Sequence, residues 1–386
     1  MRRLPRVTVA LLALSLTLSA GAVAAGTQTE RGGPLYGVKQ VVKNLTSVSS
    51  FTFAPDGDIF FNERLTGKIK RWDSATKTKS TFATVANLSG DNTNELGLLG
   101  VALHPDYPAT PYVYVFATVV RNGAIRMQVL RFTDTAGVGT NRLIAHEFDT
   151  TAGGGHVGGR ILFGPDDRLY IVTGERFDAA LAQDLTVERG KVMRFDVDTN
   201  LDGTLAPDGA PVFQGGSVED DAFVSFGHRN SFGLGFDPEN GNLWESENGP
   251  ECNDELNLIL ETDNPNYAWG PDGDCSTPPK RPRNTNNSGP TPRVLPESYW
   301  RATIAPTGLA FCDGCALDAA AEGNLLLGAF NTGQILLFDL DAERDDVLSR
   351  TIAYQHTRQV LSIERGIDGR LYFSDGRAIF RLKPAA

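Results

Sequence analysis

Residues 153–175 read G-G-G-H-V-G-G-R-I-L-F-G-P-D-D-R-L-Y-I-V-T-G-E, and the second half of this stretch recurs along the chain. That half predicts a β-hairpin, with an apolar strand at 161–163, a turn at 164–168 and a strand rich in β-formers at 169–173. The first half places five glycines around one histidine, His156. Such glycine density is typical of a sharp bend or of close approach to the backbone. An imidazole there is a candidate general base; a solvated glycine-rich turn is the alternative interpretation.

The hairpin occurs six times. Each copy has an apolar strand, a turn rich in Pro, Asp, Gly or Asn, and a second apolar strand. The copies lie at 51–61, 101–116, 161–173, 235–244, 309–328 and 363–373. Some are followed by a further strand motif, as in K-I-K-R-W-D at 68–73, K-V-M-R-F-D at 191–196 and Q-I-L-L-F-D at 334–339. Two hairpins per copy make a four-stranded sheet.

This repetition predicts an all-β fold, a six-bladed β-propeller, as a single domain over 26–386. A strand near 38–42 is expected to complete the last blade and so hide the sheet edges. The longest loops follow the third and fourth copies, where binding surfaces are expected. Tandem β-sandwiches are the alternative architecture. Helical periodicity is almost absent, with at most one turn at 183–189.

The first 25 residues have the pattern of a secretory signal, with three early arginines, an apolar run at 7–18 and alanines at 22, 24 and 25. The run is too short to span a membrane, so the prediction is a secreted or periplasmic protein without membrane insertion. Loss of this segment changes the net charge from −11 to −14. A surface this acidic repels phosphate backbones, which argues against nucleic acid as a partner.

Four cysteines in an exported chain favour two disulfides. Neighbouring residues are the expected pairs, Cys312 with Cys315 and Cys252 with Cys275. A redox C-x-x-C motif and a zinc site are the alternatives, but no βαβ pattern and no second ligand pair accompany the motif.

Polar residues also precede the fourth copy, where His228, Arg229 and Asn230 stand directly before its first strand. His156 has the comparable place before the third copy. In a propeller these positions lie at one end of the ring, so the two clusters are expected to meet at one channel mouth. An ion pair at the rim is the alternative role for Arg229.

A third stretch, E-N-G-P-E-C-N-D-E-L-N-L-I at 247–259, gathers carboxylates at Glu251, Asp254 and Glu255. The turn at Gly249 and Pro250 exposes backbone carbonyls beside them. Mixed carboxylate and carbonyl oxygens suit calcium, although the spacing is not that of an EF-hand. A solvated acidic loop is the alternative.

Together these stretches resemble the soluble glucose/sorbosone dehydrogenase family, the aldose sugar dehydrogenases that use pyrroloquinoline quinone. The matching motifs are E-L-G-L-L-G-V-A-L-H-P-D from Glu95, G-H-V-G-G-R from Gly155, G-H-R-N from Gly227, G-P at 249–250 and D-E-L-N from Asp254. The resemblance covers nearly all of the chain beyond the signal segment.

The resemblance implies a role for each matching residue. His156 would be the general base for the anomeric hydroxyl, and Arg229 would stabilise charge on the quinone. Glu95 and Asn230 would contact the cofactor. The carbonyls of Gly249 and Pro250 would hold one calcium ion, and Glu255 and Tyr267 would hold a second, structural one. An aldose and an external electron acceptor would be the partners of a monomer or homodimer.

The sequence departs from the family pattern at three places. Gly155 stands where an acidic residue precedes the histidine, and Asn331 stands where a lysine would pair with cofactor carboxylates. The expected pair of arginines before the last blade is replaced by His356 and Arg358, or by Gln359 and Leu361, depending on the alignment gap. Asn331 and Arg358 are the cofactor contacts that these positions offer, and Arg301 or another unmatched cation could add charge.

Three functions are consistent with these observations. The first is an exported quinoprotein sugar dehydrogenase that oxidises an aldose to its lactone. The second is a calcium-stabilised propeller that has lost the quinone and binds a carbohydrate or a protein. The third, a calcium-dependent lactonase, requires carboxylates that converge on one axial metal, whereas the acids here cluster in one loop.

Overall fold

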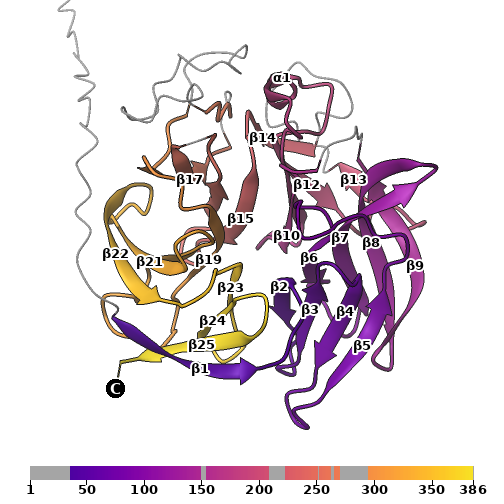
Figure 1. Cartoon of the computed structure of the whole chain (residues 1–386), viewed down its shortest axis with the longest axis horizontal. Coiled ribbons are helices and arrows are strands. Elements are labelled where there is room, and N and C mark those ends of the chain that lie inside the picture. Colours follow the sequence, from indigo (N-terminus) through magenta and orange to yellow (C-terminus); the bar gives the residue numbers. More distant parts are fainter. Residues whose placement is uncertain are drawn as a thin grey trace, which may run out of the picture.

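The structure is a computed structural model that describes residues 35–148, 154–207, 222–250, 252–261, 265–269 and 294–385. Within these residues the chain is nearly all β-strand, in six antiparallel sheets that form a ring (Figure 1). The predicted six-bladed β-propeller is therefore confirmed. The predicted signal segment, Glu251 and Cys275 lie outside the described residues.

Each sequence copy forms the two innermost strands of one blade. Blade 1 consists of β2 (Val48–Phe53), β3 (Ile59–Glu63), β4 (Lys68–Trp72) and β5 (Lys79–Thr84). Blade 2 consists of β6 (Leu98–Leu103), β7 (Tyr112–Arg121), β8 (Ala124–Thr135) and β9 (Val138–Glu147). Blade 3 consists of β10 (Gly158–Phe163), β11 (Leu169–Thr173) and β12 (Lys191–Asp196), with the short strands β13 (Ala206–Pro207) and β14 (Phe223–Phe226) both paired to β12.

The other three blades repeat this order. Blade 4 consists of β15 (Ser231–Phe236), β16 (Leu243–Glu247), β17 (Asp254–Ile259) and β18 (Ser298–Trp300). Blade 5 consists of β19 (Pro306–Phe311), β20 (Leu325–Ala329), β21 (Gln334–Leu340) and β22 (Val347–Gln355). Blade 6 consists of β23 (Ser362–Arg365), β24 (Leu371–Ser374), β25 (Ile379–Pro384) and β1 (Tyr36–Val42).

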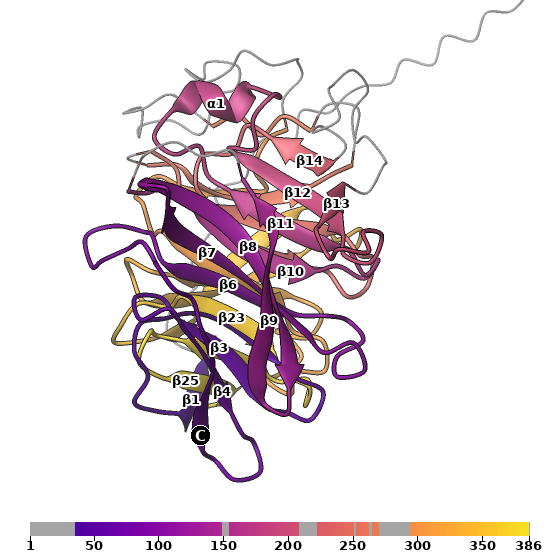
Figure 2. The ribbon, with the colours of Figure 1, turned by 90° about the vertical axis from the view of Figure 1, so that its right-hand side faces the viewer.

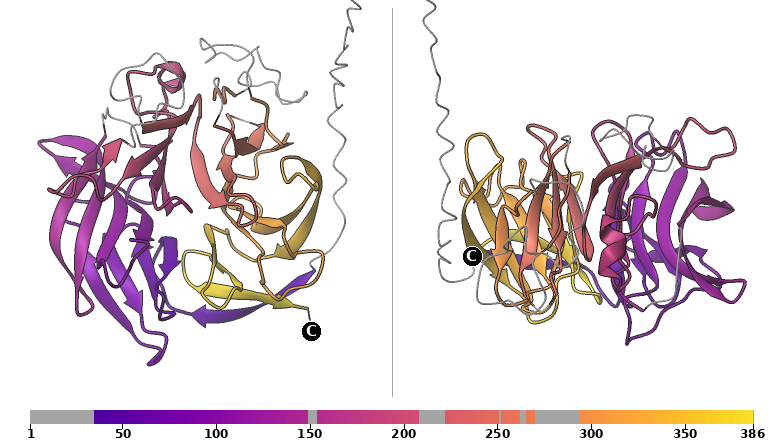
Figure 3. Two further views of the ribbon diagram at one scale, coloured as in Figure 1. Left: turned by 180° about the vertical axis from the view of Figure 1, so that it is seen from behind. Right: turned by 90° about the horizontal axis from the view of Figure 1, so that it is seen from above.

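The amino-terminal strand closes the ring, as the sequence predicts. β1 pairs antiparallel with β25, so that Val38 lies opposite Leu382 (Figures 1 and 3). The first and last parts of the described chain therefore share one sheet. This pairing covers the edge that β25 would otherwise leave open.

The core lies between the blades. Six hydrophobic clusters each join residues of two neighbouring blades, as Phe60 of β3 and Val115 of β7 do between blades 1 and 2. Burial on both faces explains why many strands are continuously apolar. Close approach of the innermost strands requires glycine at some crossings. A Cβ at Gly100 of β6 would lie 2.4 Å from the Gly159 oxygen, and one at Gly233 of β15 would lie 2.1 Å from the Thr307 oxygen.

One arginine crosses the central channel. Arg160 of β10 is 7% exposed, and its guanidinium donates to Ser50 Oγ (2.9 Å), Ser362 Oγ (3.1 Å) and the Leu361 oxygen (3.2 Å). These contacts tie blade 3 to blades 1 and 6. A buried guanidinium with several protein acceptors is a rigid strut.

The predicted helical turn at 183–189 is wrong in position. The one helix of the described residues, α1 (Ala179–Gln183), ends where that turn was expected to begin. The helix starts at Ala179 because the Asp178 side chain accepts the Ala180 N–H and caps the first turn. The helix lies at the outer rim near β12 and β14 (Figure 2). No helix in the described segments has the length and apolar character needed to cross a membrane.

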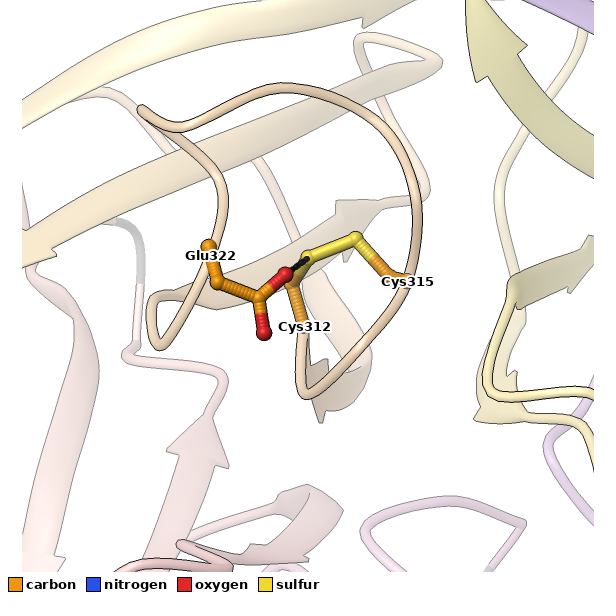
Figure 4. Close-up of side chains that lie close together, drawn as sticks. All are labelled: Cys312, Cys315 and Glu322. Atoms are coloured by element: carbon orange, nitrogen blue, oxygen red, sulfur yellow. Dashed lines mark hydrogen bonds between the residues drawn. A yellow bond between two sulfur atoms is a disulfide. The ribbon is translucent and has the colours of Figure 1, made fainter.

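Cys312 and Cys315 are bonded to each other in the loop after β19, with Cα atoms 5.0 Å apart (Figure 4). Glu322 lies beside them and accepts the Gly314 N–H at 2.6 Å. With both sulfurs in one bond, neither is a thiolate that could bind a metal. The second predicted pair involves Cys275, outside the described residues; Cys252 itself is disulfide-bonded.

Candidate functional site

A cavity of about 560 Å³ lies at the end of the ring where the innermost strands begin. The loops before each innermost strand, and those after each second strand, meet at this end because consecutive strands are antiparallel. Five of the six blades contribute to its wall, blade 3 being the exception. The side chains that matter below are Arg64, Glu95, Asn230, Phe330, Asn331, Arg358 and Arg377.

All four residues predicted to contact a cofactor line this one cavity. Glu95 comes from the loop before β6, Asn230 from the residue before β15, Asn331 from the loop after β20 and Arg358 from the loop before β23. They belong to four different blades, so only the closed ring brings them together.

His156, the predicted base, lies next to this wall. Its backbone N–H donates to Glu95 Oε2 at 2.6 Å, and its φ of 47° is in the left-handed region that non-glycine residues rarely adopt. The backbone is therefore strained at the candidate base, as is common at functional sites. The two glycines that follow, Gly158 and Gly159, have positive φ at the bulge that opens β10. The predicted solvated turn is wrong, because His156 is only 7% exposed.

Sequence reasoning missed the partner of this histidine. Nδ1 lies 2.7 Å from both carboxylate oxygens of Glu175, which is 3% exposed. Among the described residues nothing bonds to Nε2. A carboxylate at Nδ1 fixes the ring orientation and the tautomer, and it stabilises the imidazolium that forms when Nε2 takes a proton. The pair has the geometry of an oriented general base.

Arg229 meets the His156 segment through the backbone. The Glu175 N–H donates to the Arg229 oxygen at 2.9 Å, so the ends of blades 3 and 4 are in contact, although neither His156 nor Arg229 is among the residues of the cavity wall. The backbone N–H of Arg229 donates to Glu247 Oε1 at 2.9 Å, and Glu247 also bonds to the buried His228. The expectation of a rim ion pair is not met, because the guanidinium donates to the carbonyl oxygens of Asn248 and Gly249.

The predicted calcium turn at Gly249 and Pro250 is held by Asp254. This carboxylate accepts the Gly249 N–H at 2.9 Å on one oxygen, and the N–H groups of Ile304 and Ala305 on the other. Burial raises the pKa of Asp254, although these donors favour its charged form. Asp254 was counted among the candidate oxygen ligands; the structure instead places it as the organiser of the turn.

Glu255 and Tyr267, the predicted ligands of a second calcium, are both fully buried near His228. Glu255 lies opposite Glu247 in the β16–β17 register, and the His228 ring stacks on Tyr267 at 5.1 Å. The Tyr267 hydroxyl donates to the Leu258 oxygen at 2.6 Å. Its backbone carbonyl is thus the atom that could serve as a metal ligand.

Three arginines line the cavity into which Asn331, the residue in place of the expected lysine, also faces. Arg64, Arg358 and Arg377 all line the cavity, whereas Arg301 does not. Arg301, the cation considered for this role, is exposed and is not among the residues of the cavity wall. Of the two alternative pairs before the last blade, both Gln359 and Leu361 line the cavity, whereas of His356 and Arg358 only Arg358 does.

The three arginines differ in how firmly they are held. Arg64 donates to the oxygens of Asn94 and Leu96, each at 2.8 Å, and so fixes the loop that carries Glu95. Arg358 pairs with Asp375 at 3.3 Å. The Arg377 guanidinium has no partner among the described residues and is exposed. Neither Arg64 nor Arg377 was predicted, although both lie within three residues of the end of the second strand of their blades, as Glu175 does.

The sequence is similar to a known protein family over most of its length. The family model described as Glucose / Sorbosone dehydrogenase matches residues 45–379. The chain belongs to this family. The recognition made from its motifs is thereby confirmed.

Three relatives show how the family members compare. Quinoprotein glucose dehydrogenase B of Acinetobacter calcoaceticus is 31% identical over 60% of this chain, a match that spans 52% of that relative's length. Aldose sugar dehydrogenase YliI of Escherichia coli is 23% identical over 84% of this chain and 85% of its own. A solved structure of the PQQ-bound aldose sugar dehydrogenase of Streptomyces coelicolor is 25% identical, with a TM-score of 0.71 over 91% of this chain and 99% of that chain.

Proposed function

We propose that the protein is an exported quinoprotein sugar dehydrogenase that oxidises an aldose at the anomeric carbon to the lactone. Pyrroloquinoline quinone would be the hydride acceptor and calcium the metal cofactor. The observation that carries the proposal is the single cavity in which Glu95, Asn230, Asn331 and Arg358 meet beside the His156–Glu175 pair. Export rests on the amino-terminal signal pattern alone.

The residues of the cavity fit a flat, anionic group. Among the described residues, Glu95 is the one carboxylate of the wall, against three arginines. Asn230 Oδ1 is buried without a hydrogen-bond partner, so an incoming donor would satisfy it. The exposed Arg377 and the Asp375-tethered Arg358 would pair with carboxylates of the quinone.

Calcium would be held by the carbonyl oxygens of Gly249 and Pro250. The Gly249 oxygen accepts a hydrogen bond from the Arg229 guanidinium, so the metal would compete with Arg229 for this oxygen or share its second lone pair. Arg229 would then direct its charge toward the group bound beside Asn230.

The chemistry divides between cofactor and protein. When bound, the quinone supplies the hydride acceptor. His156 takes the proton of the anomeric hydroxyl at Nε2, since Glu175 holds Nδ1. Glu175 then stabilises the imidazolium, which returns its proton to solvent. Arg229 lowers the energy of negative charge that develops near the cavity wall.

The test is dye reduction by purified protein with added quinone and calcium over a panel of aldoses. Aldose-dependent reduction that requires both cofactors supports the proposal. No reduction and no spectral change at micromolar quinone would favour the second candidate, a calcium-stabilised binding module, which Asn331 supports. The lactonase candidate is disfavoured because Glu95 is the only carboxylate that the described part of the chain contributes to the cavity wall.

A further inference from the structure

Two aromatic side chains are exposed in the described part of the chain, and both stand at the cavity end of the ring. Phe330 lines the cavity and is 46% exposed. Phe177, in the turn after β11, is 63% exposed. Water contact with so much apolar surface is unfavourable, so an exposed ring at a functional site is typical of a ligand contact.

The Phe177 ring lies directly against the candidate base. Its centroid is 4.1 Å from that of the His156 imidazole, with the planes tilted by 43°. The backbone is strained to keep it there, because Arg176 and Phe177 both have left-handed φ, 63° and 65°. The Arg176 guanidinium donates to the Gly155 oxygen at 2.9 Å and anchors the turn.

Gly155 makes room for this ring. A Cβ at position 155 would lie 2.7 Å from Phe177 Cζ and 3.0 Å from Cε2. The φ of Gly155 is outside the left-handed region, so its backbone would accept a side chain. The aromatic ring of Phe177 is therefore what excludes a side chain at position 155. The glycine in place of an acidic residue and the exposed phenylalanine are thus complementary.

We propose that Phe177 is the aromatic platform of the substrate subsite, and that the Gly155–Phe177 pair selects aldopyranoses. An aldopyranose carries axial C–H bonds that form an apolar face, with hydroxyl groups at its edge. The ring would pack on that face while the neighbouring His156 reaches the anomeric hydroxyl. Open-chain polyols lack a rigid C–H face and would be poor substrates. This subsite rests on the proposed sugar oxidation.

The kinetic test compares Phe177→Ala with Phe177→Tyr, using glucose as the aldopyranose. Loss of the ring should raise KM about tenfold, with kcat reduced less than about threefold. Tyrosine should restore KM to within about twofold of the native value, because it keeps the aromatic face. Ile367→Ala removes an exposed apolar side chain from the far end of the ring and serves as the control. An unchanged KM in Phe177→Ala overturns the subsite.

The complementarity has its own test. Gly155→Asp should raise KM at least as much as Phe177→Ala does, because its side chain displaces the ring. If both act through the ring, Gly155→Asp combined with Phe177→Ala should have no larger effect than the worse single variant. If the increase in KM of the double variant equalled the product of the two single increases, the two residues would act independently and the proposed pair would be wrong.

Saturation-transfer NMR reads the contact without turnover. Transfer from the aromatic protons of the native protein to the C–H protons of glucose, lost in Phe177→Ala and weak for sorbitol, supports the platform. No transfer to glucose overturns it, even in an active enzyme. Transfer without any aldose oxidation would leave the subsite intact and contradict the proposed function instead.

Discussion

At the scale of single residues, the contacts of His156 support the role of general base that is proposed for it. Its Nδ1 is fixed by Glu175, and its N–H by Glu95, so the imidazole has one orientation. His156→Ala should keep quinone binding and lower kcat by about 10²- to 10⁴-fold, since only the proton transfer is lost. Quinone fluorescence titration and dye reduction measure the two quantities.

A histidine–glutamate pair outside the site provides the control for this variant. His146 Nε2 lies 2.6 Å from Glu188 on the outer part of the ring, so His146→Ala should leave turnover unchanged. If His156→Ala turned over at the native rate, His156 would not be the base.

For Asn331 we predict a gain in quinone affinity on substitution. Asn331→Lys adds a cation to a cavity wall that already carries three arginines. One charge-assisted hydrogen bond of about 1.5–3 kcal/mol should strengthen quinone binding roughly 10- to 100-fold. Leu348→Lys adds the same charge to an exposed site on β22 of the same blade and should change affinity little. Equal affinities for native protein and Asn331→Lys would mean that the quinone carboxylates lie elsewhere.

Motifs predicted four residues of the cavity wall but not the partner of the neighbouring His156. Glu175 was within reach, because β10 and β11 pair Gly158 with Thr173. Two residues further out on each strand lie His156 and Glu175. Applying the hairpin register beyond the strands would have found the pair. Arg377 could not be found this way, because its contact with the cavity depends on the angular position of blade 6.

At the scale of elements, the acidic loop of blade 5 changes the pKa of a glutamate in blade 4, Glu297. Burial, together with the charges of Asp346, Asp345 and Asp341, raises the pKa of Glu297 to about 8. The unfolded chain has a pKa near 4.3 for this group. The folded state therefore binds more protons between about pH 4 and 8, and its free energy of unfolding falls as pH rises through that window.

Glu297→Gln should remove this dependence. The variant should be more stable than the native protein by roughly 1–2 kcal/mol at pH 8, with the difference shrinking as pH falls toward 5. Urea unfolding at several pH values measures it. Glu343→Gln removes an exposed acid from the same loop and should show little change with pH. A constant difference across the series would rule out titration of Glu297.

The strands could be predicted because each blade repeats one hairpin whose turn residues are recognisable in the sequence. The helix α1 could not be predicted in this way. Its five residues carry too little periodicity, and its start depends on one cap, Asp178. The short strands β13 and β14 escaped prediction for the same reason.

At the scale of the whole molecule, a closed ring with its amino-terminal strand in the last blade should unfold as one unit. If calcium binds at Glu255, removing the metal should destabilise the entire ring. With millimolar calcium and micromolar affinity, chelator should lower Tm by about 5 °C.

Two variants in blade 4 sharpen this measurement. Glu255→Gln should lose most of the response to chelator, while Glu261→Gln, an exposed acid just after β17, should keep it. If the native protein had the same Tm with and without chelator, calcium would not stabilise the ring.

The sequence also predicted the ring as a whole, since six copies and a closing strand leave few other arrangements. It did not predict that Arg160 would cross the channel below the cavity, because its acceptors come from three other blades. Long-range contacts of this kind follow from closure of the ring and not from local pattern.

The most direct measurement is a crystal structure of the protein with pyrroloquinoline quinone and calcium. We predict that the quinone occupies the cavity lined by Glu95, Asn230 and Arg358, with His156 Nε2 and the Arg229 guanidinium both turned toward it. A quinone bound outside this cavity, or the two side chains facing separate spaces around it, would contradict the central claim.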